Sequence, residues 1–356
     1  MIKQLIINTE YFLQCAGSCS GCFLSSEERD SLNSFHDEIK ISILKLLEEK
    51  KLPQQELIDF MVIGFGRGNN LALSLDELEK LGQLIQYIES NFKAQKIIFE
   101  VSSSLIGKIE TQISNAIYLL NFSKNIYFNV VVNSEITSKQ FWTNLKLFHQ
   151  KLTVHRQSWG WSDNTGDILV LNINPQKLPD LAMLKIFSKG IESPINISFF
   201  PYDIQIKNIS QSEQLAVNKW TEDFIELFKE KDLNIKNYLS VFNFEIKDIH
   251  DVKNHINRTQ ETYFFIDKKG HVTNGIPSIM GEIDFPRLMD KYKLKPDINK
   301  AFNLMQKSSA CVNCDYQKYC LASGAYLNMM ANHQRLEDKT ICPSGYKIFF
   351  EKLIKL

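Results

Sequence analysis

The sequence predicts an α/β fold built on a parallel sheet, followed by a smaller C-terminal unit. Between residues 3 and 208, six apolar segments of strand length alternate with amphipathic segments of helical spacing. This alternation stops after Asn208, and the seven cysteines fall into two groups, one near each end of the chain. Alternating strands and helices give parallel strands joined by right-handed crossovers. The alternation alone allows either a barrel or a doubly wound sheet.

The six predicted strands are short apolar runs. They are Lys3–Phe12, Leu57–Phe65, Ile97–Val101, Ile126–Val132, Asp167–Ile173 and Ile195–Phe200. The helices between them carry apolar residues at helical spacing, and Ser74 followed by Glu77 forms a capping box. The predicted helices are Asp37–Lys50, Ser74–Phe92, Lys108–Leu120, Ser138–Leu152 and Leu178–Ser188. A longer amphipathic helix, Gln211–Glu230, follows the last strand.

Composition excludes several classes of function. The 356 residues contain 41 basic and 41 acidic side chains, so no overall field favours nucleic acid or a membrane surface. No apolar run approaches the roughly 18 residues that a membrane span needs, and the N-terminus lacks a secretory signal. Cysteines at close spacings and in odd number favour metal ligation over disulfides. We therefore expect a cytoplasmic protein that binds neither nucleic acid nor membrane.

The first cysteine group directly follows the first predicted strand. Cys15, Cys19 and Cys22 have C-x3-C-x2-C spacing, and the next cysteine along the chain is Cys311. A loop this short can place all three sulfurs around one metal centre. Three protein ligands leave one coordination position open for chemistry.

This loop resembles the cluster loop of the radical S-adenosylmethionine (SAM) enzymes. The resemblance implies a partial (β/α)6 barrel and a 4Fe–4S cluster held by Cys15, Cys19 and Cys22, with SAM on the fourth iron. It also implies reductive cleavage of SAM to a 5′-deoxyadenosyl radical that abstracts hydrogen from a substrate. The Cys-Ser-Gly-Cys-Phe order is similar to that of glycyl-radical activases, which leaves an activase or a small-molecule enzyme as alternatives.

SAM contacts are expected at the carboxyl ends of the strands, where parallel barrels place their active sites. After the second strand, Arg67-Gly68-Asn69-Asn70 stands where the family has Gly-Gly-Glu-Pro, and glycine there allows close backbone approach to a ligand. The residues expected to bind SAM are Phe23, Gly66, Arg67, Gly68, Asn69, Ser102, Asn133 and Asn172. Taken one at a time, each also fits ordinary turn chemistry.

The second cysteine group follows a predicted hairpin at Tyr263–Val272. Cys311, Cys314 and Cys320, with Cys342 after a longer gap, resemble part of the SPASM domain of radical SAM peptide maturases. The resemblance implies one auxiliary 4Fe–4S cluster on these four thiols, since glycine or proline replaces the other family cysteines at about Gly275, Pro286 and Gly324. Four cysteines with one C-x2-C pair also suit tetrahedral zinc.

The expected organisation is a barrel over residues 1–208, a helical linker over 209–260 and a SPASM-like domain over 261–356. The resemblance implies modification of a peptide or protein side chain, often in a small ribosomally made precursor, with flavodoxin or ferredoxin as reductant. The family's base position falls at Ile276, so Asp267 and Asp203 are the candidate bases. The first strand begins near Lys3, so any leader recognition is expected to need a separate partner or another surface. A non-enzymatic iron–sulfur or zinc redox sensor is the alternative outside enzymes.

Overall fold

The structure is a computed structural model. It describes residues 4–15, 27, 30, 34–50, 58–161, 167–188, 196–200, 208–229, 251, 254, 262–274, 298–322 and 325–353. The predictions for Cys19, Cys22, Phe23 and Asp203 lie outside these residues, as do those for Gly275, Ile276, Pro286 and Gly324 and for the Arg67 side chain.

The predicted α/β architecture is confirmed. The parallel strands are β1 (Gln4–Phe12), β2 (Ile58–Arg67), β3 (Ala94–Ser103), β4 (Ile126–Asn133), β5 (Ile168–Asn172), β6 (Asn196–Phe200) and β7 (Tyr263–Ile266), and β8 (Val272–Asn274) is antiparallel to β7. Their order in one sheet is β6-β5-β4-β3-β2-β1-β7-β8. Six strands thus alternate with helices as the sequence predicts, and their carboxyl ends share one edge.

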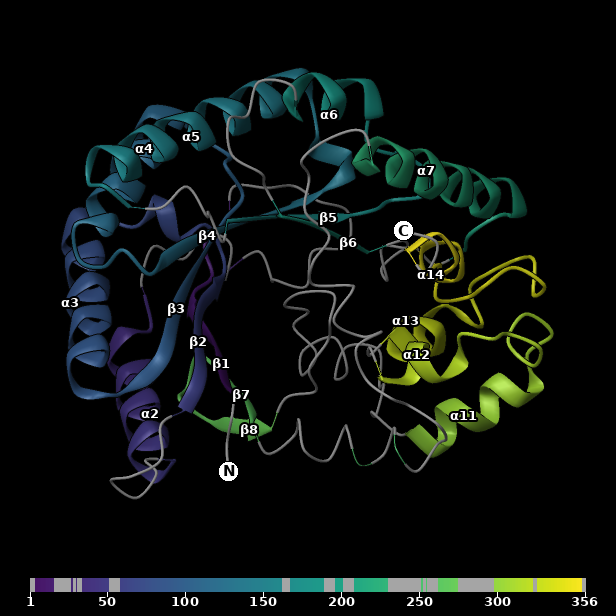
Figure 1. Ribbon diagram of the computed structural model, residues 1–356, viewed down its shortest axis with the longest axis horizontal. Helices are drawn as coiled ribbons and strands as arrows, with labels where there is room; N and C mark the ends of the chain where they lie inside the picture. The colour runs from purple at the N-terminus through teal and green to yellow at the C-terminus, as the bar shows by residue number, and fades with distance from the viewer. Residues whose placement is uncertain are drawn as a thin grey trace.

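Helices cover one face of this curved sheet. They are α2 (His36–Glu49), α3 (Leu75–Asn91), α4 (Ile109–Leu120), α5 (Lys139–Ser158), α6 (Leu181–Ser188) and α7 (Gln211–Lys229). Figure 1 shows them along the outer side of the sheet, so the opposite face lines the inside of the barrel. Ser74 caps α3 as predicted, because its side chain accepts a hydrogen bond from the Glu77 amide at 3.3 Å.

The C-terminal helices lie across the open side of the sheet (Figure 1). They are α11 (Ile298–Lys307), α12 (Gln317–Ala322), α13 (Ala325–Asn332) and α14 (Lys347–Leu353). A β-bridge between Ile209 and Leu336 joins this unit to the segment just before α7. None of the described helices is both long and apolar enough to cross a membrane.

The hairpin is part of the barrel sheet, although the sequence analysis grouped it with the C-terminal domain. β7 pairs in parallel with β1, from Ile6 opposite Tyr263 to Thr9 opposite Ile266. Its turn docks on α2, where the Ser42 hydroxyl donates to the Gly270 carbonyl at 2.7 Å. Gly270 has φ +78°, a conformation that favours glycine. The hairpin therefore adds a seventh parallel strand to the barrel.

Candidate functional site

The predicted site residues that the structure describes meet at the carboxyl edge of the sheet. Cys15 follows β1, Gly66 and Arg67 end β2, Gly68 and Asn69 follow it, and Ser102 lies near the end of β3. Asn133 ends β4 and lies opposite Asn172, which ends β5. Parallel pairing brings these positions together, since all the strand ends point the same way.

The two ends of the segment that carries the first cysteine group lie side by side at the end of β1. Cys15 lies just past the end of β1, and the Phe35 amide returns to donate to the Tyr11 carbonyl at 2.9 Å. The Tyr11 hydroxyl lies 2.7 Å from Nδ1 of His36, the first residue of α2. Cys15 is a reduced, half-buried thiol. These contacts fix both ends of the loop that contains the C-x3-C-x2-C motif.

The turn after β2 packs directly on the start of this loop. The Gly68 amide donates to the Phe12 carbonyl at 2.8 Å, and the Asn69 amide donates to the Gln14 carbonyl at 2.7 Å. A Cβ atom at Gly68 would lie 2.5 Å from the Gln14 carbonyl oxygen and 2.7 Å from the carbonyl carbon of Leu13. Real Cβ atoms do not approach backbone this closely. The glycine predicted for ligand approach therefore serves close contact with the cysteine loop.

The Asn69 side chain belongs to a buried hydrogen-bond network behind the turn. The Ser103 hydroxyl lies 3.0 Å from Asn69 Oδ1 and 2.9 Å from Gln112 Oε1, and its single hydrogen is donated to one of them at a time. The Asn69 and Gln112 amide groups both donate to the Ile106 carbonyl, at 3.3 and 2.7 Å. The Asn69 side chain therefore positions the turn, while the Asn69 backbone contacts the cysteine loop.

Two further asparagines hold the same turn, and the sequence analysis did not assign them this role. Asn70 donates through Nδ2 to the Phe65 carbonyl at 2.7 Å, and Asn115 of α4 donates to the Leu71 carbonyl at 2.9 Å. Both side chains are buried. An asparagine beside a glycine turn was the available signal for Asn70. Asn115 had none, because its partner is 44 positions away.

Asn133 has the turn chemistry that its residue type allows. Its Oδ1 accepts from the Glu135 amide at 3.0 Å and so caps the short helix η2 (Ser134–Ile136). Ser102 is buried, with 5% of its surface exposed, and Asn172 is half-buried. SAM binding by these three residues stays a prediction.

Asp267 lies at the turn between β7 and β8. Its Oδ1 accepts from the amides of Lys269 and His271 at 2.8 and 2.9 Å, and its Oδ2 lies 3.1 Å from His271 Nδ1. These are the contacts of a turn-capping carboxylate. The role of base stays a prediction for Asp267.

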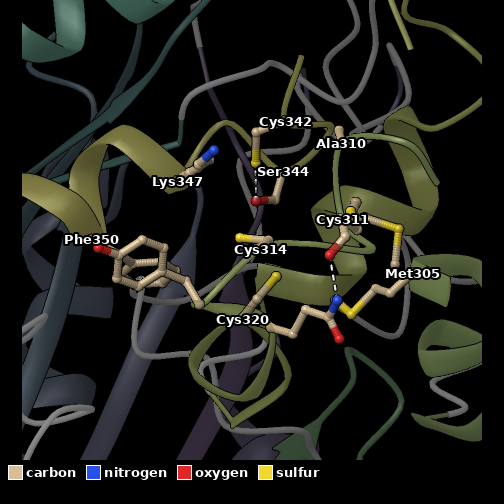
Figure 2. A pocket seen from close by; sticks show the side chains of 12 residues that line it. Met305, Ala310, Cys311, Cys314, Cys320, Cys342, Ser344, Lys347 and Phe350 are labelled. Atoms are coloured by element: carbon tan, nitrogen blue, oxygen red, sulfur yellow. Dashed lines mark hydrogen bonds between the residues drawn. The ribbon is translucent and has the colours of Figure 1, made fainter. Parts of the chain in front are cut away.

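The four C-terminal cysteines line one small pocket (Figure 2). Cys311 and Cys314 come from the segment after α11, Cys320 from α12 and Cys342 from the loop before α14. None of the four forms a disulfide, and Cys342 Sγ lies 3.2 Å from the Ser344 hydroxyl. Apolar side chains complete the wall, among them Met305, Met329 and Phe350. The structure therefore places all four cysteines of the second group in the wall of one pocket.

Burial raises the pKa of three of these thiols. It raises the pKa of Cys311 to about 11 and also raises the pKa values of Cys314 and Cys320. In the described part of the chain, no three His, Cys, Asp or Glu side chains are arranged to hold a metal ion. The thiols fit a cluster in number and chemistry, and ligation requires them to lose their protons.

Comparison with known proteins identifies the fold. No protein-family model matches the sequence, and no curated protein matches it. Three solved structures of anSMEcpe, an anaerobic sulfatase-maturating enzyme of the SPASM-type radical SAM class, do match. Native anSMEcpe with bound AdoMet and Cp18Cys peptide is 13% identical, with a TM-score of 0.54 over 98% of this chain and 96% of that chain. A histidine-tagged form of anSMEcpe with bound AdoMet is 12% identical, with a TM-score of 0.52 over 99% and 98% of the two chains. The chain therefore has the radical SAM fold that its first cysteine motif predicts.

Proposed function

We propose that the chain is a radical SAM enzyme that cleaves SAM reductively and modifies a side chain of a peptide or small protein. The observation that carries this proposal is the contact between the cysteine loop and the Gly68–Asn69 turn at the carboxyl edge of the barrel. The fold is shared over nearly the whole chain with anSMEcpe, whose solved structures contain AdoMet and a peptide.

In this proposal Cys15, Cys19 and Cys22 hold the 4Fe–4S cluster. When bound, the cluster supplies the electron that cleaves SAM to a 5′-deoxyadenosyl radical. The residues of the chain do the positioning. Gly68 lets the β2 turn lie against the cysteine loop, and the Asn69 network holds that turn in place. Phe23, Gly66, Arg67, Ser102, Asn133 and Asn172 are the proposed neighbours of SAM.

We further propose that Cys311, Cys314, Cys320 and Cys342 hold one auxiliary 4Fe–4S cluster. The pocket that these four cysteines share supports this assignment, as does the absence of a disulfide between any of them. Zinc is the alternative occupant. The proposed reductant is flavodoxin or ferredoxin, and Asp203 or Asp267 would act as base. The proposed division of labour is a barrel in 1–208, a linker in 209–260 and the cluster-binding unit in 261–356, in a cytoplasm that keeps the cysteines reduced.

The test is SAM cleavage by protein reconstituted with iron and sulfide without oxygen. With dithionite and SAM, the wild type should form 5′-deoxyadenosine, and Cys15→Ala should not. Ser309→Ala is a matched control, because this exposed hydroxyl donates to the Lys339 carbonyl within the C-terminal unit. Product from Cys15→Ala at the wild-type rate would overturn the proposal.

A further inference from the structure

The inner face of the barrel is unusually polar at mid-strand. Side chains alternate between the two faces of a strand. Phe128 packs edge-on against Phe148 of α5 and so faces the helices, which turns its neighbour Asn129 toward the lumen. By the same alternation, Phe99 faces the helices and Glu100 faces the lumen. On β1, Asn8 pairs with Gly64, which pairs in turn with Glu100, and residues paired across parallel strands share a face, so Asn8 also lies on the inner face.

The strand register gathers these side chains around a glycine. Gly64 of β2 lies opposite Asn8 on one side and opposite Glu100 on the other. Asn129 on β4 donates through Nδ2 to Glu100 Oε2 at 3.0 Å. Because β2 contributes no side chain at Gly64, the Asn8 and Glu100 side chains face each other across that position.

Two acceptors in this group have no donor in the described part of the chain. A carboxylate only accepts, so the Asn129 amide nitrogen must face Glu100 and its Oδ1 points elsewhere. The Asn8 amide nitrogen donates to the Tyr263 hydroxyl at 2.6 Å. Among the described residues, neither Asn8 Oδ1 nor Asn129 Oδ1 has a hydrogen-bond partner, although the two residues are only 2% and 4% exposed. Buried acceptors are normally paired, so two together indicate a missing donor group.

We propose that Asn8, Glu100 and Asn129 bind a positively charged side chain of the peptide substrate, a lysine or an arginine. The proposal rests on the proposed function and names its substrate class. The two amide oxygens and one carboxylate can accept several N–H bonds from one cation, and those bonds are charge-assisted. Asn8 lies four residues before the end of β1, roughly 13 Å of strand. A long side chain entering from the carboxyl edge suits that depth, below the edge where Gly68 and Cys15 lie.

The experiment measures binding of small probes to the full-length reconstituted protein by calorimetry. The probes are N-acetyl-arginine amide and N-acetyl-lysine amide, each compared with a neutral counterpart, the citrulline or norleucine derivative. Wild type should bind at least one cationic probe about tenfold or more tighter than its counterpart. Glu100→Gln, which can still accept from Asn129, should abolish that preference. Glu110→Gln, at an exposed position in the first turn of α4, should keep it.

A second variant tests the same site by gain of affinity. Asn8→Asp retains an acceptor, can accept a bond from the Tyr263 hydroxyl and adds a negative charge, so cationic probes should bind several-fold tighter. Equal binding of charged and neutral probes to wild type, or no binding, would overturn the proposal and leave internal water as the donor. SAM competing with the probe, together with weaker SAM binding by Glu100→Gln, would assign the site to the SAM ammonium and also overturn it. Probe preference without 5′-deoxyadenosine formation would support the site while refuting the proposed function.

Discussion

Gly68 and Gln14 lie against each other so closely that no side chain fits at position 68. The distance from an added Cβ to the Gln14 carbonyl oxygen would be 2.5 Å, and that oxygen also accepts the Asn69 amide hydrogen. The β2 turn and the start of the cysteine loop therefore move as one unit. Any shift of the turn displaces the backbone that leads into Cys15.

Gly68→Ala should reduce 5′-deoxyadenosine formation at least tenfold, because the added methyl group must push the β2 turn away from the cysteine loop. Gly160→Ala is the control. It also adds a methyl group, but no described atom lies within 4 Å of it, so it carries only the strain of φ +69°, about 1–2 kcal/mol. Equal rates for the two variants would show that the contact at Gly68 does not matter for cleavage.

Gln112→Leu should weaken SAM binding although residue 112 lies on α4, behind the turn. The substitution leaves the Ile106 carbonyl without its 2.7 Å donor and takes one partner from Ser103. The Ile106 carbonyl keeps only the 3.3 Å bond from Asn69, and loss of a hydrogen bond costs about 0.5–1.5 kcal/mol. Equilibrium dialysis should show a raised Kd for SAM, with a change in the spectrum of the SAM-bound reduced cluster. Gln83→Leu, on the exposed side of α3, should leave both unchanged.

Asp267→Asn separates the turn-capping role from the proposed role of base. Asparagine keeps the Oδ1 that accepts from Lys269 and His271. A role in turn capping alone predicts that both 5′-deoxyadenosine and modified peptide form at near wild-type rates, as quantified by mass spectrometry. Normal cleavage with complete loss of modified peptide would instead identify Asp267 as the base.

Cys342→Ala should remove one cluster and spare SAM cleavage. Wild type should hold about eight irons per chain, from two 4Fe–4S clusters, and the variant about four. The first cysteine loop lies on the barrel, so 5′-deoxyadenosine should still form while modified peptide falls sharply. Metal analysis decides between the occupants: about four irons and one zinc in wild type would mean that the second pocket is a zinc site.

Asp167 should make the fold sensitive to acid. Burial alone would raise its pKa, but the Arg156 guanidinium, bonded at 2.6 and 2.9 Å, holds the pKa below its usual value. A lowered pKa stabilises the fold above the unfolded value of about 3.9, and the gain is lost as pH falls through the folded pKa. Asp167→Asn should lower the free energy of unfolding at pH 7 by about 3–5 kcal/mol. Asp223→Asn, in an exposed pair with Lys219, should change it by less than about 1 kcal/mol. A urea titration at several pH values would measure both.

The structural features that could be predicted are those formed by residues close together in the sequence. Ser74 and Glu77 lie within one helical turn, so the cap of α3 could be predicted from spacing. Asn69 and Ser103 are 34 positions apart and meet only because β2 and β3 are adjacent, so their bond could not. The four residues of β7 are too few for a periodic pattern to show which strand they pair with. The grouping of Cys311, Cys314, Cys320 and Cys342 was predicted from their resemblance to the cysteine pattern of the SPASM domain, and the four do line one pocket.

The pairing of β7 with β1 has a consequence for synthesis on the ribosome. Asn8 and Tyr263 are 255 positions apart, so the edge of β1 that pairs with β7 stays unpaired until most of the chain has emerged from the ribosome. At about 5–20 residues per second, that wait lasts on the order of tens of seconds. An unpaired strand edge is a template for aggregation. The nascent chain should therefore depend on chaperones until Tyr263 leaves the exit tunnel, and truncation before the hairpin should give insoluble protein.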